Sequence, residues 1–235
     1  MAPPRATGRQ RPPQLSPDAI AGYKRAAAEA AAEILEDGMR VGLGSGSTVA
    51  QLLPVIARRR LRALICVATS PSTECAAREL GLSVRGLDDV GELDLAIDGA
   101  DQIDPRGWLI KGGGAAHTRE KIVAAAARRF VVIASAEKSV SALGPPVPLE
   151  LLRFGASCTL RAVGNSRLRE AIGPSPDGGV IADYLGPIGD PGRLAARLSA
   201  IPGVVDHGLF APELVSLILI AGETGVERRA GGALA

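Results

Sequence analysis

The 235-residue sequence has few aromatic residues, cysteines and histidines, and each shortage limits what it can encode. Aromatic residues make up 3% of the chain and hydrophobic residues 46%, so the core must be built from Ala, Val, Leu and Ile. The three cysteines show no paired spacing, which is typical of reduced thiols in a cytosolic protein rather than of a disulfide framework. Because there are only two histidines, the sequence does not predict a zinc site of ordinary composition.

The sequence also lacks long apolar runs and a large excess of either charge. No apolar stretch reaches the roughly 18 residues that a membrane helix needs, and no secretory leader is recognisable. We therefore expect a cytoplasmic protein without membrane contacts. The formal net charge of +2 gives no overall attraction to nucleic acid, so only a local basic patch could bind phosphate.

Composition divides the chain into a tail, a large domain and a smaller domain. The first fifteen residues hold four prolines and three arginines without periodicity, which is typical of disorder. A proline-rich linker begins at Gly144. The predicted division is a disordered tail over 1–15, a Rossmann-like catalytic domain over 16–143 plus 211–235, and a small α+β domain over 144–210.

The large domain is predicted to be α/β, because strand patterns alternate with helical ones. This order favours a doubly wound, mostly parallel Rossmann-like sheet, with the small α+β domain inserted before the last strand and residues 227–235 fraying. The expected strands are Met39–Leu43, Ala63–Ala68, Leu82–Arg85, Leu93–Ile97, Phe130–Ser135 and Leu214–Ala221. In the small domain we expect a helix near Leu160–Ile172, a strand at Val180–Tyr184 and a helix at Gly192–Ala200 capped by Asp190.

A turn rich in glycine and hydroxyl groups follows the first strand. It contains Ser45, Gly46, Ser47 and Thr48 and leads into a helical pattern that begins at Val49. Free N–H groups at a helix start and neighbouring hydroxyls can all donate to one phosphate, although a capped helix without ligand is the alternative. A monophosphate fits better than a dinucleotide, because Val49 stands where the dinucleotide fingerprint has its last glycine.

A second polar stretch, from Leu95 to Lys121, carries the candidate chemistry. Asp98 and Asp101 flank Gly99-Ala100, and Lys111 precedes Gly112, Gly113 and Gly114. Thr118 is expected to cap the next helix, with Glu120 in its first turn. Since ligands bind at the carboxyl ends of strands in such sheets, we expect both stretches to form one site. For Glu120 alone, compensation of the helix dipole is the alternative.

Four blocks of the sequence together resemble the type A ribose-5-phosphate isomerases. They are Gly42–Thr48, Asp98–Asp101, Lys111–Gly114 with Arg119–Lys121, and Ala136–Lys138, and the resemblance runs from about Ser16 to Val226. It implies an aldose-ketose isomerase of the pentose phosphate pathway, which interconverts D-ribose 5-phosphate and D-ribulose 5-phosphate through an enediolate. It also implies a homodimer or homotetramer that uses no metal and no cofactor.

The chemistry of such an isomerisation needs a base within about 3 Å of the carbon acid and a donor at the carbonyl oxygen. The resemblance implies that Glu120 is the base. Lys111 and the glycine N–H groups would act on the oxygen, and Asp98 and Asp101 would hold hydroxyls and orient Lys111. The remaining expected substrate contacts are Lys24, Ser45, Gly46, Ser47, Thr48, Gly99, Ala100, Gly112, Gly113, Gly114 and Lys138.

Two other functions stay open at this point. An amino-sugar phosphate deaminase would want a catalytic histidine, and His117 is the only candidate; because the isomerase family commonly has an apolar residue there, we expect a packed or partly exposed side chain. A non-catalytic sugar-phosphate sensor is the second, although all four candidate catalytic residues are retained. Gln102, Ser135 and Glu137 also depart from the residues usual in the family, which have Glu, Asp and Ser there.

Overall fold

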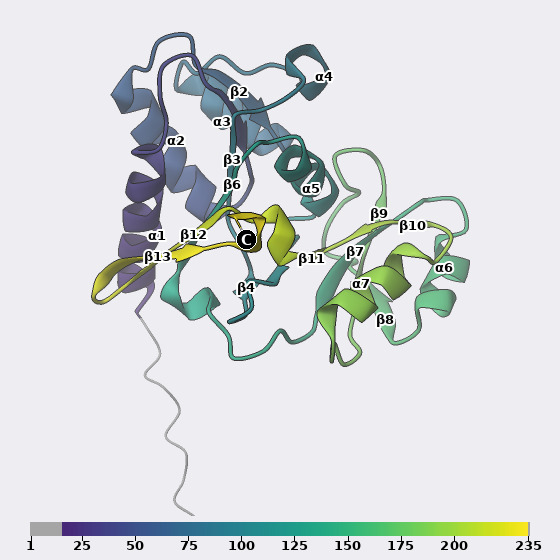
Figure 1. Ribbon diagram of the computed structural model, residues 1–235. Helices are drawn as coiled ribbons and strands as arrows, with labels where there is room; N and C mark the ends of the chain where they lie inside the picture. Colours follow the sequence, from purple (N-terminus) through teal and green to yellow (C-terminus); the bar gives the residue numbers. More distant parts are fainter. Residues whose placement is uncertain (1–15, 235) are drawn as a thin grey trace, which may run out of the picture.

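The computed structural model describes residues 16–234, and the predicted tail over 1–15 lies outside the described residues. A large sheet with helices on both faces lies beside a smaller antiparallel sheet with its own helices (Figure 1). We call the second part, Val147–His207, the small unit. Both parts meet at helix α5 (His117–Ala125), which contacts strands of each.

The large sheet has the order β13-β12-β6-β3-β1-β2, and all its neighbours pair in parallel except β13 with β12. The α/β prediction is therefore confirmed. The expectation that residues 227–235 fray is wrong, because β13 pairs with β12 from Gly225 to Ala230. Its charged residues are typical of an edge strand, which avoids pairing with other chains. The strands are β1 (Arg40–Leu43), β2 (Ile65–Ala68), β3 (Leu95–Asp98), β6 (Phe130–Ser135), β12 (Leu217–Gly222) and β13 (Gly225–Ala230).

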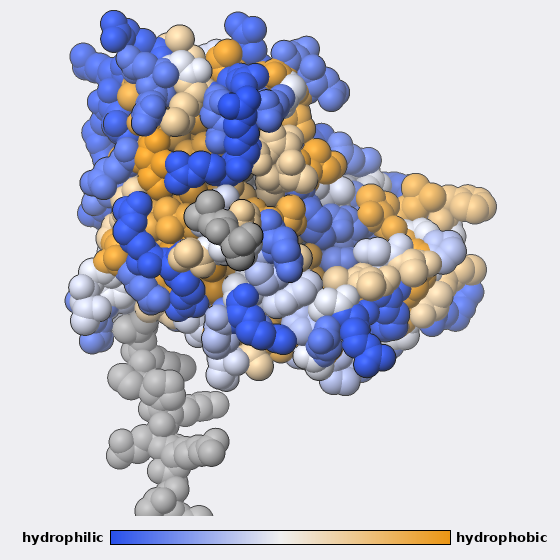
Figure 2. Space-filling model, in the orientation of Figure 1, coloured by the Kyte–Doolittle hydropathy of each residue, from blue (hydrophilic) through white to orange (hydrophobic). Residues whose placement is uncertain are grey.

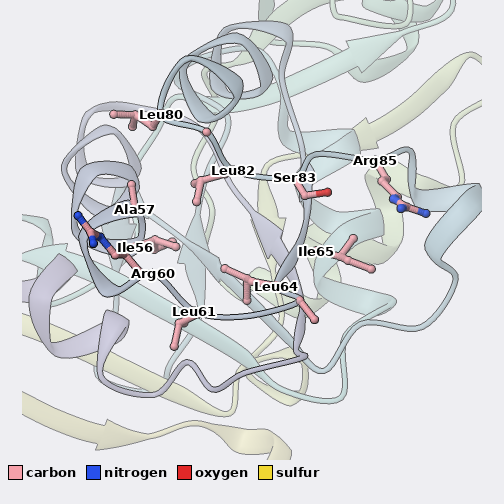
Figure 3. A pocket seen from close by; sticks show the side chains of 12 residues that line it. Ile56, Ala57, Arg60, Leu61, Leu64, Ile65, Leu80, Leu82, Ser83 and Arg85 are labelled. Carbon is pink, nitrogen blue, oxygen red and sulfur yellow. The ribbon is translucent and has the colours of Figure 1, made fainter.

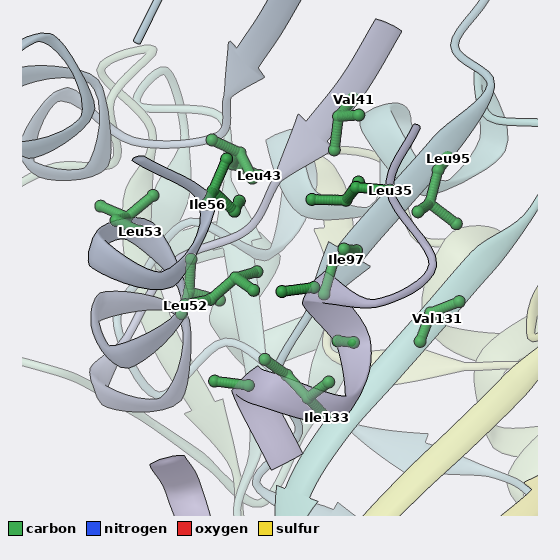
Figure 4. Close-up of a cluster of buried hydrophobic side chains, with 14 of the residues drawn as sticks. Leu35, Val41, Leu43, Leu52, Leu53, Ile56, Leu95, Ile97, Val131 and Ile133 are labelled. Atoms are coloured by element: carbon green, nitrogen blue, oxygen red, sulfur yellow. The ribbon is translucent and has the colours of Figure 1, made fainter. Parts of the chain in front are cut away.

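Alternation along the strands gives the large sheet two apolar faces. Val41 and Leu43 point to the face covered by α1 (Pro17–Ala32) and α2 (Ser47–Arg59), where they pack in a buried cluster shown in Figure 4. The opposite face packs with α5 through Val123. Ser16 caps α1, since its side chain accepts the N–H of Ala19 at 3.2 Å.

Several short elements surround the large sheet. A three-stranded sheet of order β11-β5-β4 closes one side of it. The predicted strand at Leu82–Arg85 forms only one bridge, between Cys66 and Val84. These elements are α3 (Pro71–Glu79), α4 (Leu87–Val90), β4 (Gln102–Ile103), β5 (Leu109–Ile110), η1 (Ala136–Lys138), β11 (Leu209–Phe210), η2 (Pro212–Leu214) and η3 (Gly232–Leu234).

The small unit is an antiparallel sheet of order β10-β7-β9-β8 with helices on one face. The predicted strand Val180–Tyr184 and the cap at Asp190 are confirmed. The helix predicted near Leu160–Ile172 is wrong, because it ends at Gly164 with φ 64 and a strand follows. The elements are β7 (Val147–Leu151), α6 (Ala156–Val163), β8 (Ser166–Leu168), β9 (Val180–Tyr184), α7 (Pro191–Ser199) and β10 (Val204–His207).

The surface in Figure 2 is mostly polar over the large sheet, with apolar residues at the outer end of the small unit. Within the small unit, Phe154 is 89% exposed and Leu152 53%. None of the helices in residues 16–234 combines the length and the apolar character required for a membrane span.

Candidate active site

The candidate site lies where the parallel strands β1, β3 and β6 end side by side. The turn after β1, the polar residues after β3 and the short helix after β6 surround one cavity. Of the predicted site residues, Asp98 lies behind the wall and Lys24 beside it. All the others line the cavity: Ser45, Gly46, Ser47, Thr48, Gly99, Ala100, Asp101, Lys111, Gly112, Gly113, Gly114, Glu120 and Lys138.

At the base of this cavity one ammonium lies between two carboxylates. Lys111 Nζ is 2.7 Å from Asp98 Oδ2 and 3.1 Å from Glu120 Oε2. All three residues are buried, with exposed fractions of 3% for Lys111, 3% for Asp98 and 5% for Glu120. Such a cluster is expensive to bury unless each charge is paired, so its presence in a cavity indicates function rather than stability.

Backbone N–H groups of the turn after β1 and of Gly99 hold Asp98 in place. Asp98 Oδ1 accepts the N–H of Ser45 at 3.1 Å and that of Gly99 at 2.7 Å. A Cβ at Gly44 would stand 1.9 Å from this carboxylate, so only glycine fits there. The turn after β1 therefore contacts the polar residues after β3 directly, as expected for neighbouring strands that end at the same edge of the sheet.

Lys111 directly follows β5 and is fixed by residues near the three-stranded sheet. Its backbone N–H donates to Gly208 O at 2.9 Å, and its ammonium donates to Gly99 O at 2.6 Å. The ammonium also lies 5.4 Å from the centre of the Phe210 ring. Residues far apart in sequence thus hold the ammonium in one position.

Asp101 has a different contact from the one we expected. Its Oδ2 accepts the N–H of Gly113 at 2.8 Å, and the ion pairs of Lys111 are with Asp98 and Glu120. Asp98 alone of the two aspartates orients Lys111. Asp101 instead holds the glycine loop (Gly112–Gly114), which lines the cavity.

Glu120 lies in the first turn of α5, but Thr118 is not the cap. Ala116 occupies the cap position without a side-chain hydrogen bond, and the Thr118 hydroxyl donates to Glu150 of the small unit. The Ser45 hydroxyl donates to Glu120 Oε1, which aims the carboxylate into the cavity. Sequence reasoning missed this pair because its members are 75 residues apart.

Burial and neighbouring charges change the proton affinities of this cluster. Burial, followed by the charge of Glu120, raises the pKa of Asp98 to about 7 despite the attraction of Lys111. Burial alone would lower the pKa of Lys111, but Asp98 and Glu120 together raise it. The ammonium therefore stays charged at neutral pH, while Asp98 takes up a proton more readily than an exposed aspartate does.

The outer end of the cavity suits an anion. Ser47 begins α2, and Lys24 Nζ donates to the Ser47 hydroxyl at 2.9 Å. Lys138 lines the cavity from the short helix after β6. Two lysines and a helix start thus surround the predicted phosphate position.

Comparisons with known proteins show which family the chain belongs to. The family model for ribose 5-phosphate isomerase A (phosphoriboisomerase A) matches residues 65–225. The chain belongs to this family. It is 47% identical over 219 residues to ribose-5-phosphate isomerase A of Roseiflexus castenholzii, covering 87% of this chain and 93% of the relative. For the enzyme of Caulobacter vibrioides the identity is 46%, with 87% and 96% covered.

Solved structures of isomerases have the same fold. Ribose 5 phosphate isomerase A from Neisseria gonorrhoeae matches with a TM-score of 0.85 at 31% identity, covering 90% of this chain and 97% of that one. A D-ribose-5-phosphate isomerase in complex with phospho-erythronic acid matches with a TM-score of 0.84 at 32% identity, covering 90% and 99%.

The departures from usual isomerase residues form contacts of their own. The Gln102 amide donates to Gly144 O at 2.9 Å and accepts the Gly144 N–H at 2.8 Å, which a carboxylate could not do on both sides. Ser135 Oγ donates to Glu137 Oε1 at 2.6 Å. None of these three residues lines the cavity.

His117 is fully buried, which is the packed form of the packed or partly exposed side chain that we expected. It packs against Gly112, where an added Cβ would stand 2.7 Å from the His117 ring. Burial lowers the pKa of His117 to about 4, although Asp206 attracts the proton; Lys121 and His207 repel it. The ring is therefore neutral at physiological pH and belongs to the packing under the glycine loop.

We expect His117→Leu to weaken the acid sensitivity of folding. In the unfolded chain a histidine takes a proton below about pH 6.5, whereas folded His117 resists until about pH 4, so the free energy of unfolding falls between these values. Between pH 7.5 and 5 the variant should lose about 2 kcal/mol less than the wild type in urea unfolding. Equal losses would contradict a buried neutral ring.

A larger cavity of ≈ 580 Å³ lies away from this site, between α2, α3 and β2 (Figure 3). Ile56, Leu64 and Leu82 line it together with two arginines, Arg60 and Arg85. It offers no carboxylate beside a cation and thus no acid–base pair.

Within residues 16–234, no group of three or more His, Cys, Asp or Glu side chains is arranged to hold a metal ion.

Proposed function

We propose that this chain interconverts D-ribose 5-phosphate and D-ribulose 5-phosphate through an enediolate, with Glu120 as the base. The observation that carries the proposal is the buried pair of Glu120 and Lys111, 3.1 Å apart at the base of a cavity whose mouth suits a phosphate. One carboxylate and one ammonium are the two groups that the reaction needs. The family relationship and the bound sugar-acid phosphate of a solved relative support this substrate class.

The proposed steps conserve every proton. Glu120 takes the proton from C2 of the open-chain aldose as negative charge develops on O1. The Lys111 ammonium stabilises this charge, which is worth more in a buried site than in water. Glu120 then returns the proton to C1, while the O2 hydroxyl proton passes to O1 and leaves a carbonyl at C2. Asp98 keeps Lys111 charged and in position.

The phosphate position leads to a prediction for Lys138→Ala. Loss of one charged hydrogen bond to phosphate is worth about 1.5–3 kcal/mol, so KM and the inhibition constant of inorganic phosphate should both rise roughly 10–150-fold. Arg85→Ala removes an exposed cation that does not line this cavity and serves as the control. If both constants keep their wild-type values in Lys138→Ala, phosphate binds elsewhere.

The competing functions gain no support from the geometry. A deaminase would need His117 at the reacting atoms, but this ring is buried against Gly112 and does not line the cavity. A sensor would have no use for a buried base beside an ammonium.

We further propose a cytoplasmic homodimer or homotetramer in the pentose phosphate pathway, for which the exposed Phe154 and Leu152 offer an apolar contact surface.

The direct test is a coupled assay of ketose formation from ribose 5-phosphate after exhaustive chelation. We expect full activity with chelator present, because the proposed chemistry uses side chains alone. Activity that disappears with chelator and returns with zinc or magnesium would overturn this mechanism. Complete inactivity toward ribose 5-phosphate would overturn the proposed function itself.

A further inference from the structure

One face of the small sheet carries three carboxylates, those of Glu150, Asp183 and Asp206. Pro148 pairs with Asp183, and Glu150 pairs with both Ile181 and Asp206, so their side chains share this face. The alternate residues, such as Leu149 and Ala182, pack under the helices of the small unit on the other face. The face with the carboxylates is turned toward α5, where Glu150 and Asp206 find partners.

Each of these carboxylates is bonded to a group next to the active site. Asp206 pairs with Lys121 of α5 at 2.6 Å, and Glu150 accepts the Thr118 hydroxyl of the same helix. Asp183 pairs with Arg169, whose Nε donates to it at 3.0 Å. Two of the three contacts therefore hold the helix that carries Glu120.

The third contact reaches the glycine loop through Arg169. Arg169 Nη1 donates to Gly112 O at 3.0 Å and to Gly113 O at 3.1 Å. Asp101 holds the Gly113 N–H from the other side at 2.8 Å. The loop is thus fixed by opposite charges on its two sides, directly after Lys111. Gly112 has φ 103, a backbone conformation that residues with a side chain rarely adopt.

We propose that Arg169 is a positioning residue of the isomerase site, which holds the glycine loop against the substrate from the small unit. The proposal rests on the proposed function. Arg169 touches neither Glu120 nor Lys111 and does not line the cavity, so it acts through the peptide groups of Gly112 and Gly113. It fixes the peptide groups of the glycine loop, which lines the cavity directly after Lys111.

Only an arginine can make this set of contacts. The planar guanidinium presents five donors, so two can pair with Asp183 while a third nitrogen reaches both carbonyls. The side chains of Arg169 and Asp183 are 15% and 11% exposed, which reduces screening by solvent. A lysine could replace one of these contacts but not the whole set.

The test compares Arg169→Ala and Arg169→Lys with the control Arg167→Ala, an exposed arginine two residues earlier in β8. Misplacement of a binding group by about 1 Å reduces turnover by up to about 100-fold, so kcat should fall roughly 10–100-fold in both Arg169 variants. The inhibition constant of inorganic phosphate should stay within about twofold, because the anion end is formed by other elements. Millimolar guanidinium should restore part of the kcat of Arg169→Ala.

The outcomes separate this proposal from the proposed function. A wild-type protein without isomerase activity defeats the proposed function. An active wild type whose Arg169→Lys variant keeps the kcat of Arg167→Ala defeats the positioning role. A parallel loss of kcat and phosphate inhibition in Arg169→Lys also defeats it, since that pattern indicates general disruption. If Arg169→Ala does not fold, the Arg169→Lys variant decides by the same two readouts.

Discussion

The Glu120→Gln variant is expected to lose about 10²–10⁴-fold in kcat while it still binds sugar phosphate. The amide keeps the size and the helix propensity of Glu120 but cannot take a proton from carbon. Its oxygen can still accept the Ser45 hydroxyl, so the geometry of the cavity survives. Steady-state kinetics with ribose 5-phosphate and phosphate inhibition measure the two effects separately.

The matched control is Glu74→Gln, since Glu74 is also an acid in the first turn of a helix, α3. If an acid only compensates the helix dipole, its replacement by Gln costs about 0.3–1 kcal/mol of stability and leaves kcat unchanged. If both variants keep wild-type kcat, Glu120 only stabilises its helix. If Glu120→Gln alone is slow, the carboxylate takes part in the reaction.

The Lys111→Met variant is expected to lose both activity and stability. Removing the ammonium leaves Asp98 and Glu120 buried without a cation, and breaking such a pair destabilises by about 3–5 kcal/mol. Loss of a donor at the developing oxyanion should reduce kcat about 10²–10³-fold. Urea unfolding and turnover measure the two losses.

A double variant separates the two roles of Lys111. In Lys111→Met/Asp98→Asn the asparagine oxygen can still accept the N–H groups of Ser45 and Gly99, while one buried charge disappears. We expect this protein to regain part of the lost stability and none of the activity. Recovery of both together would contradict an electrophilic role for Lys111. So would an unfolding free energy of Lys111→Met within 1 kcal/mol of wild type.

The strand ends were predictable from sequence because their polar residues follow apolar runs directly. This pattern predicted one site for Ser45, Asp98 and Lys138; Ser45 and Lys138 line its cavity, and Asp98 lies behind the wall. It could not distinguish Asp98 from Asp101, because that depends on which carboxylate reaches Lys111 and which reaches Gly113.

Contacts between distant segments were beyond prediction. Arg169 and Gly112 are 57 residues apart, and no local pattern links an arginine after a short strand to a glycine loop. The edge strand β13 was missed because charged residues at an edge resemble a frayed end. The prediction of a helix near Leu160–Ile172 was wrong because the apolar periodicity continues past Gly164, where the helix ends.

The most direct test of the account is exchange of the substrate C2 hydrogen with solvent, followed by NMR in deuterated water containing chelator. The wild type should incorporate deuterium from solvent as it isomerises ribose 5-phosphate, because Glu120 holds the proton between its two carbon positions. Glu120→Gln should show at least about 10²-fold slower exchange, while Glu74→Gln exchanges at the wild-type rate. Exchange at the wild-type rate in Glu120→Gln would contradict the assignment of Glu120 as the base.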